Sequence, residues 1–154
     1  MEINKIENAD FKKLICSDIL KDLPEWFGIP ESVDEYIKQS SKMTFFASYD
    51  INTITGFLAI KKHNPYSAEI YVMGINKSYH RNGIGKRLVN KCIEWCKENN
   101  IEFLQVKTLD ESNPDKNYEK TRRFYESVGF KPLECFKTLW DENNPCLLMV
   151  MKIN

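Results

Sequence analysis

The hydrophobic pattern of this chain changes period at one glycine turn, and that change constrains the fold more than any other feature. Three β-type runs, at about 43–50, 53–62 and 66–75, are rich in Phe, Tyr, Ile and Thr and are separated by short turn signals, which predicts an antiparallel meander. From Gly83 onward the apolar residues recur at helical spacing as far as about Asn99. The sequence therefore predicts strands and a helix that share one core.

The residues before the meander predict a short strand and two helices. The strand is expected over 3–6, and a first helix over 10–21, with Asp10 as its N-cap. A second helix is expected over about 32–40, where Ser32 begins a capping box. These elements form a helical N-terminal arm in front of the sheet.

The residues after the glycine-turn helix predict three more strands and one more helix. A strand is expected over 101–108, a helix over 118–128 closed by Gly129, and two last strands over about 130–139 and 146–153. The expected fold class is α/β (α+β), a mixed and mostly antiparallel sheet of about seven strands flanked by about four helices.

Length and charge exclude several classes of protein. The 154 residues have the length of one domain, and no repeat or linker divides them, so residues 1–154 are expected to form a single domain. Lys and Arg number 22 and Asp and Glu number 22, so no net charge attracts nucleic acid. No apolar run is long enough to span a membrane and no signal peptide is present, so we expect a cytoplasmic protein without a membrane partner.

The five cysteines are odd in number and include no CxxC pair, which favours reduced thiols over a disulfide framework or a zinc site. Cys92 and Cys96 lie four residues apart on the apolar face of a predicted helix. Ligands of the usual type are missing nearby, so we interpret both as small buried hydrophobes and expect no metal.

The glycine turn has the features of an anion site. Gly83 and Gly85 begin an amphipathic helix, whose first backbone N–H groups are unpaired donors at the positive end of the helix dipole. Glycine lets phosphate oxygens approach the backbone closely. Arg81, Lys86 and Arg87 add positive charge. We therefore expect the turn to bind a phosphate group.

Two common phosphate-binding motifs do not match this turn. A Rossmann turn requires a third glycine, which is missing after Gly85, and the turn lies well past the end of its strand. A Walker A loop requires Ser or Thr after its lysine, but Lys86 is followed by Arg87. The remaining alternative without a ligand is that the two glycines only shape the start of a helix.

The turn resembles the pyrophosphate motif of the GNAT superfamily of acyl-CoA-dependent N-acyltransferases. That motif is Gln or Arg, two residues, Gly, one residue, and Gly or Ala, and here His80, Gly83 and Gly85 stand at its positions. A second segment, 118–130, resembles the family's Asn-x-x-Ala-x-x-Phe/Tyr-Tyr-x-x-x-Gly-Phe pattern, with Tyr in the place of Asn and Thr121 in the place of Ala. The two matches occur in the family's order and cover the chain from about 43 to 139.

The resemblance implies transfer of an acetyl group from acetyl-CoA to a primary amine by direct attack in a ternary complex. The acceptor amine belongs to a small molecule or to a protein or peptide, and the family also includes homodimers. A non-catalytic acyl-CoA-binding module or sensor is the alternative function, and a plain protein-interaction domain is a third. Binding of acetyl-CoA and release of free CoA thiol separate the three.

The resemblance also points to two catalytic candidates. Glu69 begins the third meander strand, where several family members carry a catalytic carboxylate, and it is the candidate base, acting directly or through water. By strand alternation it should face the same side as Tyr71 and Met73; the alternative is an exposed carboxylate at a strand start. Tyr125 is the candidate acid for the leaving sulfur; the alternative is an aromatic ring that packs with Phe124.

The remaining expected contacts are to the cofactor. The backbone N–H groups around 73–75 are expected to bind the thioester carbonyl and pantetheine. The full expected set is Met73, Gly74, Ile75, His80, Arg81, Asn82, Gly83, Ile84, Gly85, Lys86, Asn117, Thr121, Phe124 and Tyr125.

Three other segments have weaker functional interpretations. Residues 26–31 link the two N-terminal helices and could shape an acceptor site or only pack as a loop. His63, near a hairpin turn, is expected to be solvated. The turn at 140–145 could border the acceptor cleft or a dimer contact.

Overall fold

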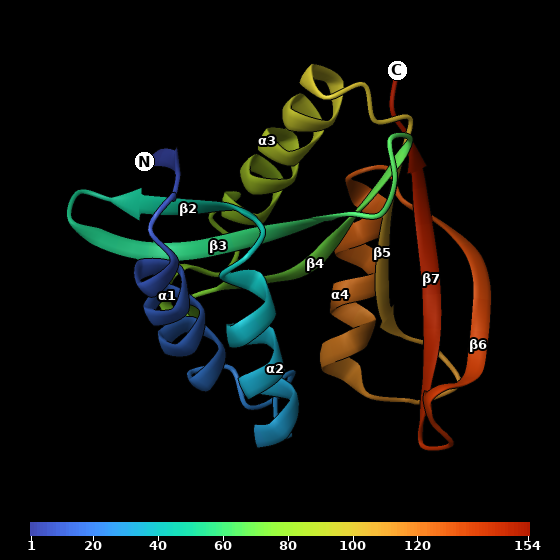
Figure 1. Cartoon of the computed structure of the whole chain (residues 1–154). Coiled ribbons are helices and arrows are strands. Elements are labelled where there is room, and N and C mark those ends of the chain that lie inside the picture. The colour runs from blue at the N-terminus through green and yellow to red at the C-terminus, as the bar shows by residue number, and fades with distance from the viewer.

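Seven strands form one sheet in the computed structural model, which describes all 154 residues (Figure 1). The strands are β1 (Glu2–Lys5), β2 (Thr44–Asp50), β3 (Thr53–Lys62), β4 (Ser67–Ile75), β5 (Phe103–Leu109), β6 (Lys131–Asp141) and β7 (Asn144–Lys152). Their order across the sheet is β1-β2-β3-β4-β5-β7-β6. Every neighbouring pair is antiparallel except β4 with β5.

Four helices and one short 3₁₀ turn accompany the sheet. They are α1 (Ala9–Lys21), α2 (Pro30–Ser40), the 3₁₀ turn (Lys77–Tyr79), α3 (Ile84–Glu98) and α4 (Lys116–Ser127). No helix combines the length and the apolar character that a membrane crossing requires. The order and number of elements confirm the fold class predicted from the sequence.

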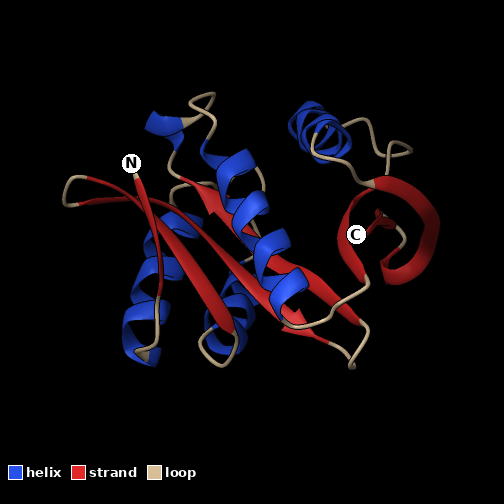
Figure 2. Ribbon diagram, turned by 90° about the horizontal axis from the view of Figure 1, so that it is seen from above, coloured by secondary structure: helices blue, strands red, loops and turns tan.

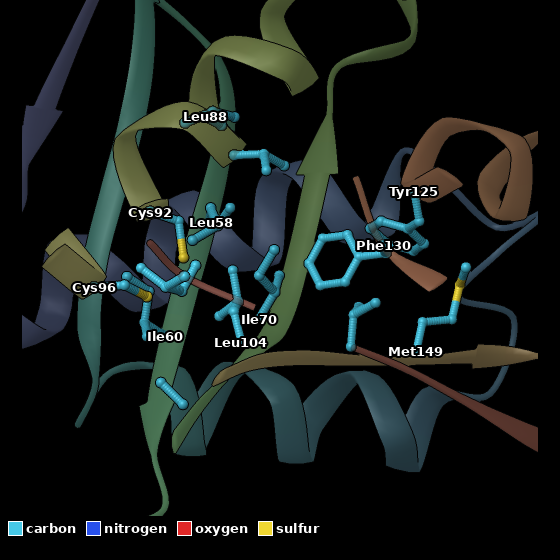
Figure 3. Close-up of a cluster of buried hydrophobic side chains, with 14 of the residues drawn as sticks. Leu58, Ile60, Ile70, Leu88, Cys92, Cys96, Leu104, Tyr125, Phe130 and Met149 are labelled. Atoms are coloured by element: carbon cyan, nitrogen blue, oxygen red, sulfur yellow. The ribbon is translucent and has the colours of Figure 1, made fainter. Parts of the chain in front are cut away.

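Helices cover both faces of the sheet, which gives the protein two cores (Figure 2). Residues of α3 and α4 pack on one face with Leu58, Ile70 and Leu104, and residues of α1 and α2 pack on the other with Phe45 and Phe57. Figure 3 shows the first core, in which Cys92 and Cys96 point from α3 toward β3. Both cysteines are fully buried, as small hydrophobic residues are.

The parallel strands β4 and β5 separate along their length (Figure 1). Their pairing runs only from Ser67–Phe103 to Ile70–Val106, yet β4 continues to Ile75 and β5 to Leu109. Beyond Ile70 the backbone groups on this side of β4 therefore have no partner on β5. The gap between the strands creates space inside the sheet.

A β-bulge at Tyr71 changes the direction of the side chains in β4. Ile60 pairs with Ile70 and Ala59 pairs with Val72, so Tyr71 is an extra residue without a partner on β3. Tyr71 packs with the α1–α2 core, whereas Met73 packs with the α3–α4 core. The expectation that these two side chains share a face was wrong, because simple alternation fails across a bulge.

Both N-terminal helices begin differently from the sequence prediction. Asn8, not Asp10, caps α1, and its Oδ1 accepts from the backbone N–H of Phe11 at 2.9 Å. Helix α2 begins at Pro30 without a side-chain cap, and the predicted Ser32 cap is wrong. Proline is favoured at the first helical position because its φ is already helical and its missing N–H leaves no donor unpaired.

Candidate active site

A cavity of about 870 Å³ lies where β4 and β5 separate. It is lined by both strands, by the start of α3, by α4 and by the loop that follows α1. Every charged side chain in the lining is basic: Arg81, Lys86, Lys107, Lys120 and Arg123. A cavity with this lining favours a negatively charged ligand.

The start of α3 forms one end of the cavity. Gly83 has φ 76° and Arg81 has φ 66°, so two left-handed residues shape the turn. No side chain caps the helix, and a Cβ on Gly83 would meet no atom within 4 Å. The first N–H groups of α3 therefore face open space, which is the arrangement of an anion site at a helix N-terminus.

The left-handed conformation at Gly83 gives a stability prediction. Gly83→Ala is expected to lower the free energy of unfolding by about 1 kcal/mol, because an alanine at positive φ is strained. Gly83→Asn is the matched control and should lose less, since asparagine visits this region more readily. Urea unfolding of the three proteins measures both losses. Equal stabilities would contradict the assigned backbone conformation.

His80 holds the loop before α3 against the end of β4. Its Nε2 lies 2.8 Å from the backbone oxygen of Ile75, and because a carbonyl only accepts, Nε2 donates. The ring also meets the edge of Trp26 with centroids 5.8 Å apart. His80 lines the cavity, but its Nε2 already donates to Ile75 and is therefore not available to a ligand.

Tyr125 lines the cavity from α4 and keeps a free hydroxyl. Its ring packs edge-on against Phe130 with centroids 5.6 Å apart, and the residue is 7% exposed. The hydroxyl makes no hydrogen bond within the protein, and burial raises the pKa of Tyr125 well above its usual value. At neutral pH this group is a protonated donor on a residue that lines the cavity.

Glu69 is buried behind the cavity wall rather than exposed at a strand start. Its Oε1 accepts from His63 Nε2 at 2.7 Å and from Lys107 Nζ at 3.0 Å, and the residue is 6% exposed. Glu69 does not line the cavity, but Lys107 does. His63, predicted to be only solvated, is instead a partner of Glu69.

The loop after α1 is fastened to α4 across the gap in the sheet. Trp26 Nε1 donates to Thr121 Oγ1 at 3.0 Å and to the backbone oxygen of Asn117 at 3.2 Å. The hydroxyl of Tyr118 donates to the backbone oxygen of Trp26 at 2.6 Å. We call these three hydrogen bonds, which join Trp26 to Asn117, Tyr118 and Thr121, the Trp26 strap. It places the predicted acceptor-site loop at the cavity and occupies the hydroxyl of Thr121.

The structure brings most of the predicted site residues together around this cavity. Those that line it are Met73, Gly74, Ile75, His80, Arg81, Gly83, Ile84, Gly85, Lys86, Thr121, Phe124 and Tyr125. Asn82, Asn117 and Glu69 do not line it, although the backbone oxygen of Asn117 binds Trp26.

Sequence reasoning missed several polar groups on the cavity wall, among them Lys120, Arg123 and Ser127 of α4. Lys107 and Thr108 come from β5, and Tyr36 comes from α2. Thr108 Oγ1 is buried without a hydrogen-bond partner, so it is available to a ligand. The sequence does contain a signal for two of these groups: Lys107 and Thr108 are adjacent polar residues near the end of the otherwise mostly apolar strand β5.

Comparisons with known proteins identify the family. A family model described as the Acetyltransferase (GNAT) family matches residues 12–130. The chain is 26% identical over 103 residues to the uncharacterized N-acetyltransferase YsnE of Bacillus subtilis, and the match covers 67% of this chain and 66% of that protein. It therefore spans slightly less than two thirds of that relative's length.

Solved structures share the fold over the full length. A putative GNAT-family acetyltransferase from Desulfovibrio desulfuricans has a TM-score of 0.83 at 14% identity, covering 99% of both chains. An aminoglycoside 6'-N-acetyltransferase complexed with coenzyme A has a TM-score of 0.77 at 19% identity, covering 100% of this chain and 98% of that one. The chain belongs to the GNAT family of acetyltransferases, which confirms the resemblance found in the sequence.

Proposed function

We propose that this protein is an N-acetyltransferase that transfers an acetyl group from acetyl-CoA to a primary amine by direct attack in a ternary complex. One observation carries the proposal: a single basic cavity joins the uncapped start of α3, the unpaired edge of β4 and the free hydroxyl of Tyr125. A cytoplasmic location fits the five free cysteines.

The residues on the cavity wall fit acetyl-CoA. The N–H groups at the start of α3, with Arg81 and Lys86, would hold the pyrophosphate, because a helix N-terminus and cations both attract phosphate. Gly83 leaves open space above the backbone there. The backbone of Met73–Ile75, which has no partner on β5, would bind the pantetheine amides and the thioester carbonyl.

The reaction requires one new bond, one broken bond and two proton movements. The neutral amine nitrogen forms a bond to the acetyl carbon, the carbon–sulfur bond of the thioester breaks, one proton leaves the nitrogen and one reaches the sulfur. An acceptor that binds as an ammonium ion first loses one further proton, since only the neutral amine can attack. Tyr125 would supply the proton to the sulfur, because its hydroxyl is protonated and the residue lines the cavity.

Glu69 is the proposed base, and its position favours action through water rather than by direct contact. Its Oε1 already accepts from His63 and Lys107, whereas its Oε2 makes no hydrogen bond within the protein. Because Glu69 lies behind the cavity wall, a water molecule beside Lys107 would carry the proton from the amine to the carboxylate.

The first test is the thermal unfolding midpoint with acetyl-CoA, with NADH and ATP as controls. A ligand at about 100 times its dissociation constant adds about 2.7 kcal/mol to the free energy of unfolding, so the midpoint should rise by about 5–10 °C. A rise with acetyl-CoA alone is the expected result. An unchanged midpoint at a saturating concentration of acetyl-CoA would contradict the proposal.

Release of CoA thiol with a panel of amines then separates an enzyme from an acyl-CoA sensor. Thiol release that depends on both acetyl-CoA and an amine is expected. Binding of acetyl-CoA, with no turnover of any amine, would instead favour the non-catalytic alternative.

A further inference from the structure

The cavity has two ends of different chemistry. The start of α3 and Tyr125 lie on the α3–α4 face of the sheet, together with Ile84. The other end carries five aromatic side chains, most of which pack against the α1–α2 core; we call it the aromatic end, and its residues are Trp26, Phe27, Tyr36, Tyr71 and Tyr118. The cavity passes between the separated strands β4 and β5. Because acetyl-CoA is proposed to occupy the end at α3, the aromatic end is left for the acceptor amine.

The rings of the aromatic end hold one another in place. Tyr36 meets Tyr71 edge to face with centroids 5.4 Å apart, and Phe27 meets Tyr36 in the same way at 5.8 Å. Burial raises the pKa of Tyr36, and it raises that of Tyr71 to about 12. Their hydroxyls are therefore neutral, and neither makes a hydrogen bond within the protein. The aromatic end offers rigid apolar walls and neutral donors.

The charge around the aromatic end is not suited to a polycation. Lys107 lines the cavity from β5, and the ammonium of Lys61 lies 6.0 Å from the ring centre of Tyr71. The nearby carboxylate of Glu69 is already paired with Lys107 and His63 behind the wall. No acidic side chain lines any part of the cavity. The carboxylates of Glu35 and Asp115 lie near Tyr71 and Tyr118 but outside the lining. A second ammonium on the acceptor would find cations in the lining and no counter-ion in direct contact.

We propose that the acceptor is a monoamine on an apolar body about the size of an aromatic ring, and not a polycation such as an aminoglycoside or a polyamine. A single ammonium can bind against the faces of the aromatic rings before it loses its proton. The apolar body gains by leaving water among these rings. This inference rests on the proposed function and narrows its substrate class.

The test compares kcat/KM for phenethylamine, spermidine and kanamycin, measured by release of CoA thiol. Phenethylamine is expected to exceed both polycations by at least about tenfold, since an unpaired second charge opposes binding. A value for either polycation equal to or above that for phenethylamine would overturn the inference.

A charge change at the aromatic end tests the cause of the preference. Phe27→Asp places a carboxylate in the lining and should shift the ratio of kcat/KM toward spermidine by at least about tenfold. Phe27→Leu, which also shortens the side chain but stays apolar, should not shift the ratio toward spermidine. An unchanged ratio in a folded Phe27→Asp variant would overturn the inference, and the comparison of amines on the unaltered protein stands if that variant does not fold.

The unfolding midpoint distinguishes failure of this inference from failure of the proposed function. If acetyl-CoA raises the midpoint but phenethylamine neither reacts nor raises the midpoint further in the presence of CoA, the monoamine class is wrong and the cofactor assignment stands. If acetyl-CoA causes no rise, the proposed function fails and this inference fails with it.

Discussion

Tyr125→Phe is expected to lower kcat by roughly 10²- to 10⁴-fold, the range that a positioned acid or base contributes. The substitution removes one hydroxyl that makes no hydrogen bond within the protein, so the packing of the ring against Phe130 stays. The free energy of unfolding and the midpoint rise caused by acetyl-CoA should therefore stay nearly unchanged. Stopped assays of CoA thiol release at saturating substrates measure the effect.

The pH dependence provides an independent check on Tyr125. Burial raises the pKa of its hydroxyl in the folded protein, so the acid stays protonated at every pH below the usual value of about 10. The activity of the unaltered protein should therefore show no loss from this group as pH rises to about 10. Tyr49→Phe on β2, outside the cavity lining, is the matched control and should keep full activity. A Tyr125→Phe variant as active as this control would exclude the proposed acid.

The features of this protein that the sequence predicts are those that consecutive residues specify. The change of period at Gly83 predicts both the end of the meander and the start of α3, because a helix and its first turn are specified by consecutive residues. Consecutive residues also specify the uncapped N–H groups at the start of α3, where an anion is expected to bind. Family resemblance adds Tyr125, which the structure places on the same cavity.

Several features that prediction missed depend on pairing between different elements of the chain. The bulge at Tyr71 is a mismatch of register with β3, so no pattern within β4 reveals it. The Trp26 strap joins residues 95 positions apart, and the pair Lys107–Glu69 joins residues 38 positions apart. His63 looks like a solvated turn residue until β4 brings Glu69 beside it. The Trp26 strap and the pair Lys107–Glu69 lie at or beside the aromatic end, where the acceptor is proposed to bind, so sequence patterns say less about the acceptor than about the cofactor.

Glu69→Gln is expected to lower both kcat and the free energy of unfolding. Glu69→Gln keeps the shape of the side chain but removes the negative charge from Lys107 and His63. We expect the free energy of unfolding to fall by about 1–2 kcal/mol, less than for a fully buried pair because both partners are partly exposed. As the proposed base, Glu69 should also account for a loss in kcat of at least roughly 10²-fold. His63→Gln, which removes only one contact, is the control for the structural share of this loss.

A double substitution separates a base from a residue that only positions Lys107. Removing both charges, in Glu69→Gln with Lys107→Gln, should restore part of the lost stability because no unpaired charge stays beside the cavity wall. If Glu69 accepts the proton of the amine, kcat of the double variant stays as low as that of Glu69→Gln. If Glu69 only holds Lys107 in place, kcat of the double variant equals that of Lys107→Gln alone. We expect stability to recover without activity, because a glutamine amide can replace a hydrogen bond but cannot take a proton at neutral pH.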